Sequence, residues 1–210
     1  FHQQLKVFVD SDDPVKIIEL KLKNLTQEQR RITATYYAEW VLGANRESSI
    51  KFIIPSFENE SSSLMARNSY SAEFSDRVAF LTSDRPAHGI TTDRDEFLGS
   101  PGSRHEPAAL CRVGLSGKVE PGFDPCAALQ IHLNIKPGEE QKLIFVLGQG
   151  VDEAVARKLA LTYSQPEKIE DSFNKLIDRW DQLLSSTQVE TPSSRSEERR
   201  VGKECRSRWS

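Results

Sequence analysis

The chain has 210 residues, of which 37% are hydrophobic and 28% charged, and its formal net charge is -3. This composition is ordinary for a soluble globular protein, and the length suffices for one large domain or two small ones. The nearly neutral charge argues against a nucleic-acid partner, and no apolar run reaches the roughly 18 residues that cross a bilayer. The few cysteines form no Cys-x-x-Cys pair, which favours a reducing compartment. Cys111 and Cys126 have apolar neighbours, so we expect both to be buried free thiols.

The first two thirds of the chain are predicted to form strands. Residues 15–25 alternate apolar and charged side chains most cleanly at 19–23, which is typical of a half-buried strand. Residues 31–42 repeat the pattern, with one face made of Ile32, Ala34, Tyr36, Ala38 and Trp40. Because a short polar connection joins the two segments, the pattern predicts an antiparallel hairpin.

Further strands are expected along the chain, at residues 5–9, 50–54, 64–67, 78–82, 127–135 and 142–147. Connections rich in Gly, Pro and Asp separate them, notably residues 91–107 and 115–125. Many strands with turns and no helices between them favour an all-β sandwich over residues 1–150.

The period of the pattern changes after residue 150. Asp152 is placed to cap one helix, and Pro166 lies in the first turn of a second, where the missing N–H of proline is harmless. The apolar residues of the second helix fall on one stripe, namely Ile169, Phe173, Leu176, Ile177, Trp180, Leu183 and Leu184. Such a stripe needs a partner surface, so residues 151–192 are expected to be a helical linker toward a further domain.

Both ends of the chain are expected to be artificial. The chain starts at Phe1 inside a strand-like run, so we expect an N-terminal truncation. Residues 193–210 are rich in arginine and resemble a stray tail found on unrelated translations of assembled environmental DNA, so we expect this tail to be non-native. The alternative is a basic arm that binds nucleic acid or an acidic partner.

The most distinctive motifs are RNSYSAEFSDRVAF at 67–80, DRDEFLG at 93–99, LSGKV at 115–119 and DPCAALQ at 124–130, with YAEWVLG at 37–43 and VLG at 146–148. In this order they resemble the N-terminal supersandwich domain of glycoside hydrolase family 94, from residue 1 to about 192. The resemblance is closest to the branch of cyclic β-1,2-glucan synthases and β-1,2-oligoglucan phosphorylases. The chain departs from that pattern in two expected loops, at Ser100-Pro-Gly and at Glu120-Pro121.

The resemblance implies an all-β fold with C-terminal helices. Its parts are an antiparallel, galactose-mutarotase-like β-supersandwich (1–150) and a two-helix linker (151–192) toward an (α/α)6 catalytic barrel. Enzymes of the family cleave β-glucosides by inverting phosphorolysis, in which inorganic phosphate is a co-substrate and an aspartic acid of the barrel protonates the leaving oxygen. The resemblance therefore implies no catalytic residue, no metal and no cofactor in this chain.

The expected partners are a β-glucan oligosaccharide, the barrel of the same parent chain and a second copy in a homodimer, with no nucleic acid. The expected location is the cytoplasm, where segments outside this chain could attach the parent enzyme to the inner membrane.

Five residues are candidates for a sugar-site rim. Asp93, Arg94 and Glu96 form a charged loop, but carboxylates adjacent in sequence rarely flank one scissile bond. An Arg–Asp network that braces the loop is therefore the favoured interpretation, and a sugar contact, in this subunit or across a dimer, is the alternative. Arg77 is interpreted in the same way. Tyr37 lies on the strand face opposite Tyr36 and Trp40, so it is the aromatic residue expected at the surface, whereas those two are expected in the core.

Two functions remain open. In the first, the chain is the scaffold and carbohydrate-binding domain of a glycoside phosphorylase or a cyclic β-1,2-glucan synthase. The helix stripe of Ile169, Phe173 and Trp180 should then be exposed in this chain. In the second, the chain is a free-standing carbohydrate-binding β-sandwich with an exposed aromatic strip. A less favoured alternative is a sugar epimerase that uses His88 or His105 with a glutamate as acid and base.

Overall fold

The computed structural model describes residues 1–70, 73–122 and 124–186. The chain divides into two compact units, Phe1–Phe173 and Asn174–Ser210. The arginine-rich tail at 193–210 lies outside the described residues.

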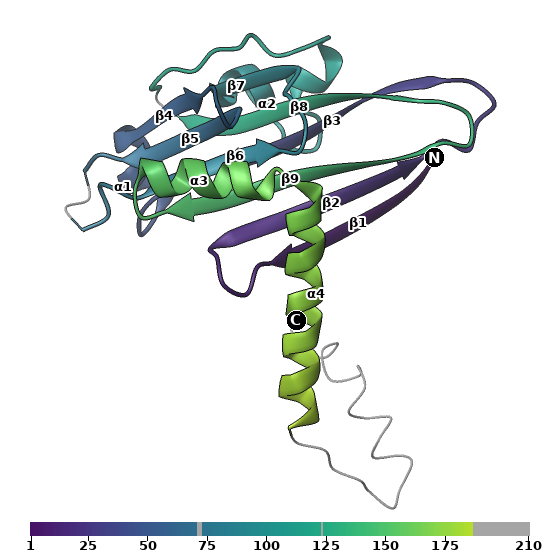
Figure 1. Cartoon of the computed structure of the whole chain (residues 1–210). Helices are drawn as coiled ribbons and strands as arrows, with labels where there is room; N and C mark the ends of the chain where they lie inside the picture. Colours follow the sequence, from purple (N-terminus) through teal and green to yellow (C-terminus); the bar gives the residue numbers. More distant parts are fainter. Residues whose placement is uncertain (71–72, 123, 187–210) are drawn as a thin grey trace, which may run out of the picture. The chain divides into compact units, whose positions relative to one another are not determined.

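The first unit contains two antiparallel sheets (Figure 1). One has six strands in the order β1 (His2–Val9), β2 (Val15–Lys23), β9 (Glu140–Gly150), β6 (Val78–Ser83), β5 (Ser63–Asn68) and β4 (Ile53–Glu58). The other has three, in the order β3 (Arg30–Glu39), β8 (Pro125–Ile135) and β7 (Gly89–Asp93). The all-β sandwich with C-terminal helices that the sequence predicts is thus confirmed.

The core lies between the two sheets, because alternate residues of each strand point to one face. Buried side chains that face it include Ile18, Leu22, Leu129, Ile131, Leu133, Leu143 and Phe145. Tyr36 packs against Phe145 with ring centroids 5.5 Å apart, and Trp40 is buried in the same cluster. The expectation that Tyr36 and Trp40 are core residues is confirmed.

The predicted hairpin of residues 15–25 with 31–42 is wrong. β2 pairs with β1 and β9, whereas β3 pairs with β8 in the other sheet. The connection between β2 and β3 therefore crosses from one sheet to the other. Asn24 fixes this crossing, because its side-chain amide donates to the carbonyls of Glu28 (2.7 Å) and Ile135 (3.0 Å). Alternation shows that a strand has one buried face, but it does not choose the partner.

Other differences are local. The strand expected at 50–54 begins only at Ile53, after the short helix α1 (Arg46–Ser49) and a 3-10 turn. The connection expected at 91–107 contains the end of β7 and the helix α2 (Arg94–Leu98). Cys126 is buried, and burial raises the pKa of its thiol to about 12. Cys111 is exposed, contrary to expectation, because it ends a 3-10 turn at the surface.

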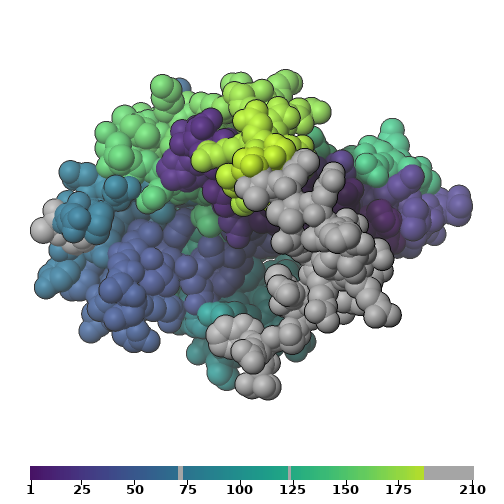
Figure 2. Space-filling view, turned by 90° about the horizontal axis from the view of Figure 1, so that it is seen from below, coloured from purple at the N-terminus to yellow at the C-terminus, as the bar shows by residue number. Residues whose placement is uncertain are grey.

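Two helices follow the sandwich, as the change of period predicts. Asp152 caps α3 (Glu153–Tyr163) by accepting a hydrogen bond from the Val155 amide at 2.8 Å. The buried face of α3 covers β9 and β6 (Figure 1). The Tyr163 hydroxyl donates to Asp13 at 2.8 Å, and Figure 2 shows α3 in green beside the purple N-terminal strands.

Helix α4 (Pro166–Ser185) crosses the boundary between the two units. Ile169 is only 1% exposed, which corrects the expectation of an exposed stripe at that position. Phe173 packs edge-on against Phe8 with ring centroids 5.1 Å apart. The neighbouring Ser172 hydroxyl donates to Asp10 in the β1–β2 turn. None of the helices in the described part of the chain is long and apolar enough to cross a membrane.

Candidate functional site

The carboxylate of Glu39, at the end of β3, is the centre of an arginine network. Its side chain is 13% exposed and lies 2.8 Å from Arg104, 3.3 Å from Arg94 and 3.6 Å from Arg46. The Tyr37 hydroxyl also donates to it at 3.0 Å. Burial alone would raise the pKa of Glu39, but hydrogen bonds from Arg104, Tyr37 and Arg94 outweigh it and lower the pKa. Glu39 is therefore held ionised as an acceptor.

Asp124 closes the network from the other side. It accepts a hydrogen bond from Arg46 and lies 3.4 Å from the Nε atom of Arg94. The two carboxylates and their arginines thus connect β3, α1, α2 and the segment before β8. Sequence reasoning missed Glu39 as the hub, although it lies within the YAEWVLG motif, because its partners are distant in the chain.

Asp93 is the N-cap of α2. Its carboxylate accepts from the backbone amides of Asp95 (2.9 Å) and Glu96 (3.2 Å) and forms an ion pair with Lys118 at 3.1 Å. Burial alone would raise the pKa of Asp93, but the hydrogen bond from the Glu96 amide and the ion pair with Lys118 outweigh it and lower the pKa. The carboxylate is thus fully engaged in holding the helix start.

Glu96 connects α2 to β7 and to the loop that contains Ser116. It accepts from the Thr91 hydroxyl at 2.5 Å and from both the amide and the hydroxyl of Ser116 at 2.7 Å. These hydrogen bonds lower the pKa of Glu96 against the opposing effect of burial. The geometry at Asp93, Arg94 and Glu96 is therefore that of a braced loop.

Tyr37 lies under α2. Its ring stacks on that of Phe97, with centroids 4.4 Å apart and an interplanar angle of 7°. Burial raises the pKa of the Tyr37 hydroxyl, and its hydrogen bond to Glu39 acts in the same direction. The structure thus gives Tyr37 two packing contacts and leaves it half-buried.

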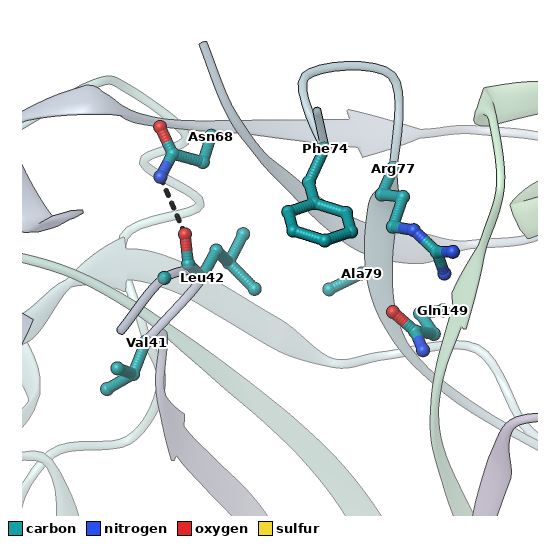
Figure 3. A pocket seen from close by; sticks show the side chains of 8 residues that line it. Val41, Leu42, Asn68, Phe74, Arg77, Ala79 and Gln149 are labelled. Carbon is teal, nitrogen blue, oxygen red and sulfur yellow. Dashed lines mark hydrogen bonds between the residues drawn. The ribbon is translucent and has the colours of Figure 1, made fainter. Parts of the chain in front are cut away.

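Arg77 lies elsewhere, at a pocket of about 360 Å³ (Figure 3). The lining residues are Val41, Leu42, Gly43, Asn68, Phe74, Arg77, Ala79 and Gln149. Val41 and Leu42 form one wall, and the Phe74 ring projects into the space between them and Ala79 (Figure 3). The guanidinium of Arg77 lies 5.5 Å from the centre of the Phe74 ring. This volume is at the small end of the range of about 300–1,000 Å³ that is usual for ligand pockets.

The polar groups of this pocket divide into two kinds. Asn68 is structural, because its amide donates to the Leu42 carbonyl at 2.6 Å and its oxygen accepts from the Tyr70 amide at 2.9 Å. For the side chains of Arg77 and Gln149, no hydrogen-bond partner occurs among the described residues. The pocket therefore offers two planar polar groups, each without a hydrogen-bond partner among the described residues, beside an apolar surface.

Sequence reasoning identified Arg77 but not Phe74 or Gln149. Phe74 is in the same motif as Arg77, at 67–80, and Gln149 directly follows the VLG motif at 146–148. Their meeting depends on the pairing of Ala79 with Gln149 between β6 and β9, which the sequence does not give.

The histidines occupy separate surroundings. The ring of His88 lies against that of His132, with centroids 3.5 Å apart, and His105 is exposed. In the described ranges no group of three or more His, Cys, Asp or Glu side chains is arranged to hold a metal ion.

The two packed antiparallel sheets, with a small pocket beside the ends of β5, β6 and β9, define a β-sandwich domain of the supersandwich class. The family described as "Glycosyl hydrolase 94, supersandwich domain" matches residues 1–166. The chain belongs to this family, as the motifs predict.

Known relatives are much longer than this chain. It is 31% identical over 184 residues to a cyclic beta-(1,2)-glucan synthase of Rhizobium meliloti (strain 1021), a match that covers 85% of this chain and 6% of the synthase. It is 28% identical over 192 residues to solabiose phosphorylase of Paenibacillus borealis, covering 89% of this chain and 25% of that enzyme. An N,N'-diacetylchitobiose phosphorylase of Vibrio furnissii is 22% identical over 191 residues, covering 89% and 24%. The chain thus corresponds to a quarter or less of each relative.

Proposed function

We propose that the chain is the scaffold and carbohydrate-binding domain of a β-glucan-active glycoside phosphorylase or cyclic β-1,2-glucan synthase. The observation that carries the proposal is the family match over residues 1–166. The contrast between two regions of the sandwich supports it. The charged motif at residues 93–99 braces the fold, whereas the pocket at Arg77 keeps polar groups available to a ligand.

In the parent enzyme, chemistry would take place on a helical barrel reached through residues 151–192. Inorganic phosphate would attack the glucoside with inversion, and an aspartic acid of the barrel would protonate the leaving oxygen. Within the second unit, α4 carries the exposed apolar side chains of Ile177, Trp180, Leu183 and Leu184. An exposed apolar row of this kind is typical of an interaction surface, and we assign it to the contact with the barrel.

A chimaera tests the scaffold role. The region of the Rhizobium synthase that matches this chain, 184 aligned residues, would be replaced by the corresponding part of the chain. We expect a folded protein that still makes glucan. A second chimaera with Trp180→Ser and Leu183→Ser should lose most of its activity or its solubility, whereas Val113→Ser, another exposed apolar residue, should change neither. A folded first chimaera without activity would contradict the scaffold role.

The second candidate is a free-standing carbohydrate-binding module. The unpaired side chains at the pocket favour this candidate as much as the first. The exposed apolar residues of α4 distinguish the two candidates, because a free-standing module has no barrel for them to contact. A monodisperse monomer that binds no dye for apolar surface would favour the free module, and self-association that Trp180→Ser abolishes would favour the scaffold.

A further inference from the structure

Three segments that carry the family resemblance meet at the Arg77 pocket. Residues 37–43 supply its apolar wall, residues 67–80 supply Phe74 and Arg77, and Gln149 follows residues 146–148. The strand pairing explains the meeting, because Ala79 of β6 is opposite Gln149 of β9 and Arg77 lies two residues before Ala79. Side chains two residues apart in an extended chain point to the same side, so Arg77, Ala79 and Gln149 face the pocket together (Figure 3).

The turn before β6 positions the aromatic ring and the guanidinium relative to each other. The Arg77 amide donates to the Phe74 carbonyl at 3.1 Å, which closes the turn. The guanidinium then lies near the Phe74 ring, and Phe74, which lines the pocket, is 47% exposed. An apolar surface and a pair of planar hydrogen-bonding groups are therefore presented side by side.

This combination matches the two kinds of surface on a pyranose. The C–H face of a sugar ring is apolar and packs on aromatic or aliphatic side chains, whereas its hydroxyls hydrogen-bond to donors and acceptors such as guanidinium and amide groups. Leu42 and Phe74 supply the first kind of surface, and Arg77 and Gln149 supply the second.

The charge of the region favours a neutral ligand over phosphate. Arg77 is the only charged residue that lines the pocket within the described chain, and Glu73 and Asp76 precede it in the same loop. An anion would meet a single guanidinium with two carboxylates nearby, which is a weak phosphate site. A neutral sugar is not repelled by these carboxylates.

We infer that this pocket binds one neutral pyranose unit of a β-glucan chain. Phe74 and Leu42 contact the apolar face of the ring, and Arg77 and Gln149 bind its hydroxyls. The inference rests on the proposed carbohydrate-binding role and assigns that role to one place.

The test is a titration of the whole isotope-labelled chain, followed by amide NMR shifts. The two probes, used separately, are a β-1,2-linked glucose trisaccharide and inorganic phosphate. The trisaccharide should shift the amides around Phe74, Arg77 and Gln149 with weak affinity, and phosphate at the same concentration should not. Phe74→Ala should weaken trisaccharide binding by about tenfold, and Arg77→Ala and Gln149→Glu by about fivefold each.

The matched controls are Phe1→Ala and Arg30→Ala, which remove an aromatic ring and a guanidinium of similar exposure away from the pocket. Both should bind like the unmodified chain. If the trisaccharide binds but the three pocket variants bind it normally, the pocket assignment is overturned while the carbohydrate-binding role stands. If the trisaccharide does not bind at all, both are overturned. Phosphate shifts in place of sugar shifts would also overturn the assignment.

Discussion

The two arginine regions of the sandwich differ in how completely their charges are paired. Around Glu39, three guanidiniums share two carboxylates, and each arginine has at least one oxygen within 3.6 Å. At the pocket, Arg77 has an aromatic neighbour and no carboxylate partner within the described residues. A charge-rich motif can thus be structural, while the group available for a ligand lies in a less charged segment.

The difference follows from burial. A half-buried guanidinium loses hydration, and only close carboxylates restore the lost interactions. Arg94, the first residue of α2, needs both Glu39 and Asp124 for this reason. Arg77 is exposed, so water satisfies it until a ligand replaces the water.

The largest effect on stability is expected from Glu39→Ala. Removing the hub leaves Arg46, Arg94 and Arg104 with too few acceptors, and we expect the free energy of unfolding to fall by about 2–3 kcal/mol. Urea unfolding followed by circular dichroism measures it. Glu47→Ala, an exposed residue of α1, is the control and should leave the unfolding midpoint unchanged. Equal midpoints for both variants would mean that the network does not hold the fold.

The second effect is a loss of stability in acid. The pKa values of Glu39, Asp93 and Glu96 are lowered in the folded chain. A carboxyl whose pKa is lower when folded stabilises the fold above its unfolded pKa, and this contribution disappears as the pH falls through the folded pKa. Unfolding free energies should therefore be constant near neutrality and decrease below a pH of about 4.5, the ordinary pKa of a glutamate carboxyl.

Glu96→Gln sharpens this prediction. The variant should be less stable than the unmodified chain at pH 7, because the amide accepts more weakly from Thr91 and Ser116. It should lose less stability between pH 5 and pH 3, since one of the titrating groups is gone. Parallel pH curves for the two proteins would show that Glu96 does not contribute to the acid sensitivity.

A smaller effect is expected at the cap of α2. Asp93→Ala removes the acceptor for two backbone amides and should lower the free energy of unfolding by about 1 kcal/mol. Asp93→Asn keeps a capping oxygen and loses only the charge opposite Lys118. It should therefore lower the free energy of unfolding by only about 0.3 kcal/mol. Thermal unfolding of the two variants distinguishes a cap from an ion pair, and equal losses would show that the ion pair dominates.

The sequence predicts the local features of this fold better than its long-range pairing. The alternation of apolar and polar residues predicts that Tyr36 and Trp40 lie in the core, and Asp152 predicts the start of α3 because it is placed as an N-cap. The partner of β2, however, depends on contacts such as Asn24 with Ile135, which are 111 residues apart. The hub at Glu39 depends in the same way on Arg94 and Arg104, which are 55 and 65 residues away.

The candidate site shows the same division. Arg77 stands out in the sequence because it lies in a motif, but its partners at the pocket depend on how β6 and β9 pair. Phe74 is one turn away and Gln149 is on another strand. A motif can therefore indicate one residue of a pocket, while the pocket itself follows only from the sheet.

The smallest effect on stability is expected from Arg77→Ala. Measured beside Arg94→Ala, it is the most direct test of the contrast between the two arginine regions. Arg94 loses ion pairs at 3.3 and 3.4 Å, so its replacement should lower the free energy of unfolding by about 1–2 kcal/mol. Arg77 has no carboxylate to leave behind, so its replacement should change stability by less than about 0.5 kcal/mol. Glucan binding should show the reverse order, because the pocket loses its guanidinium while the braced loop does not contact the sugar. Urea unfolding and the trisaccharide titration on the same two proteins measure both orders. If Arg77→Ala proves as destabilising as Arg94→Ala, then Arg77 has a structural partner in the folded chain, and its availability to a ligand is no longer supported.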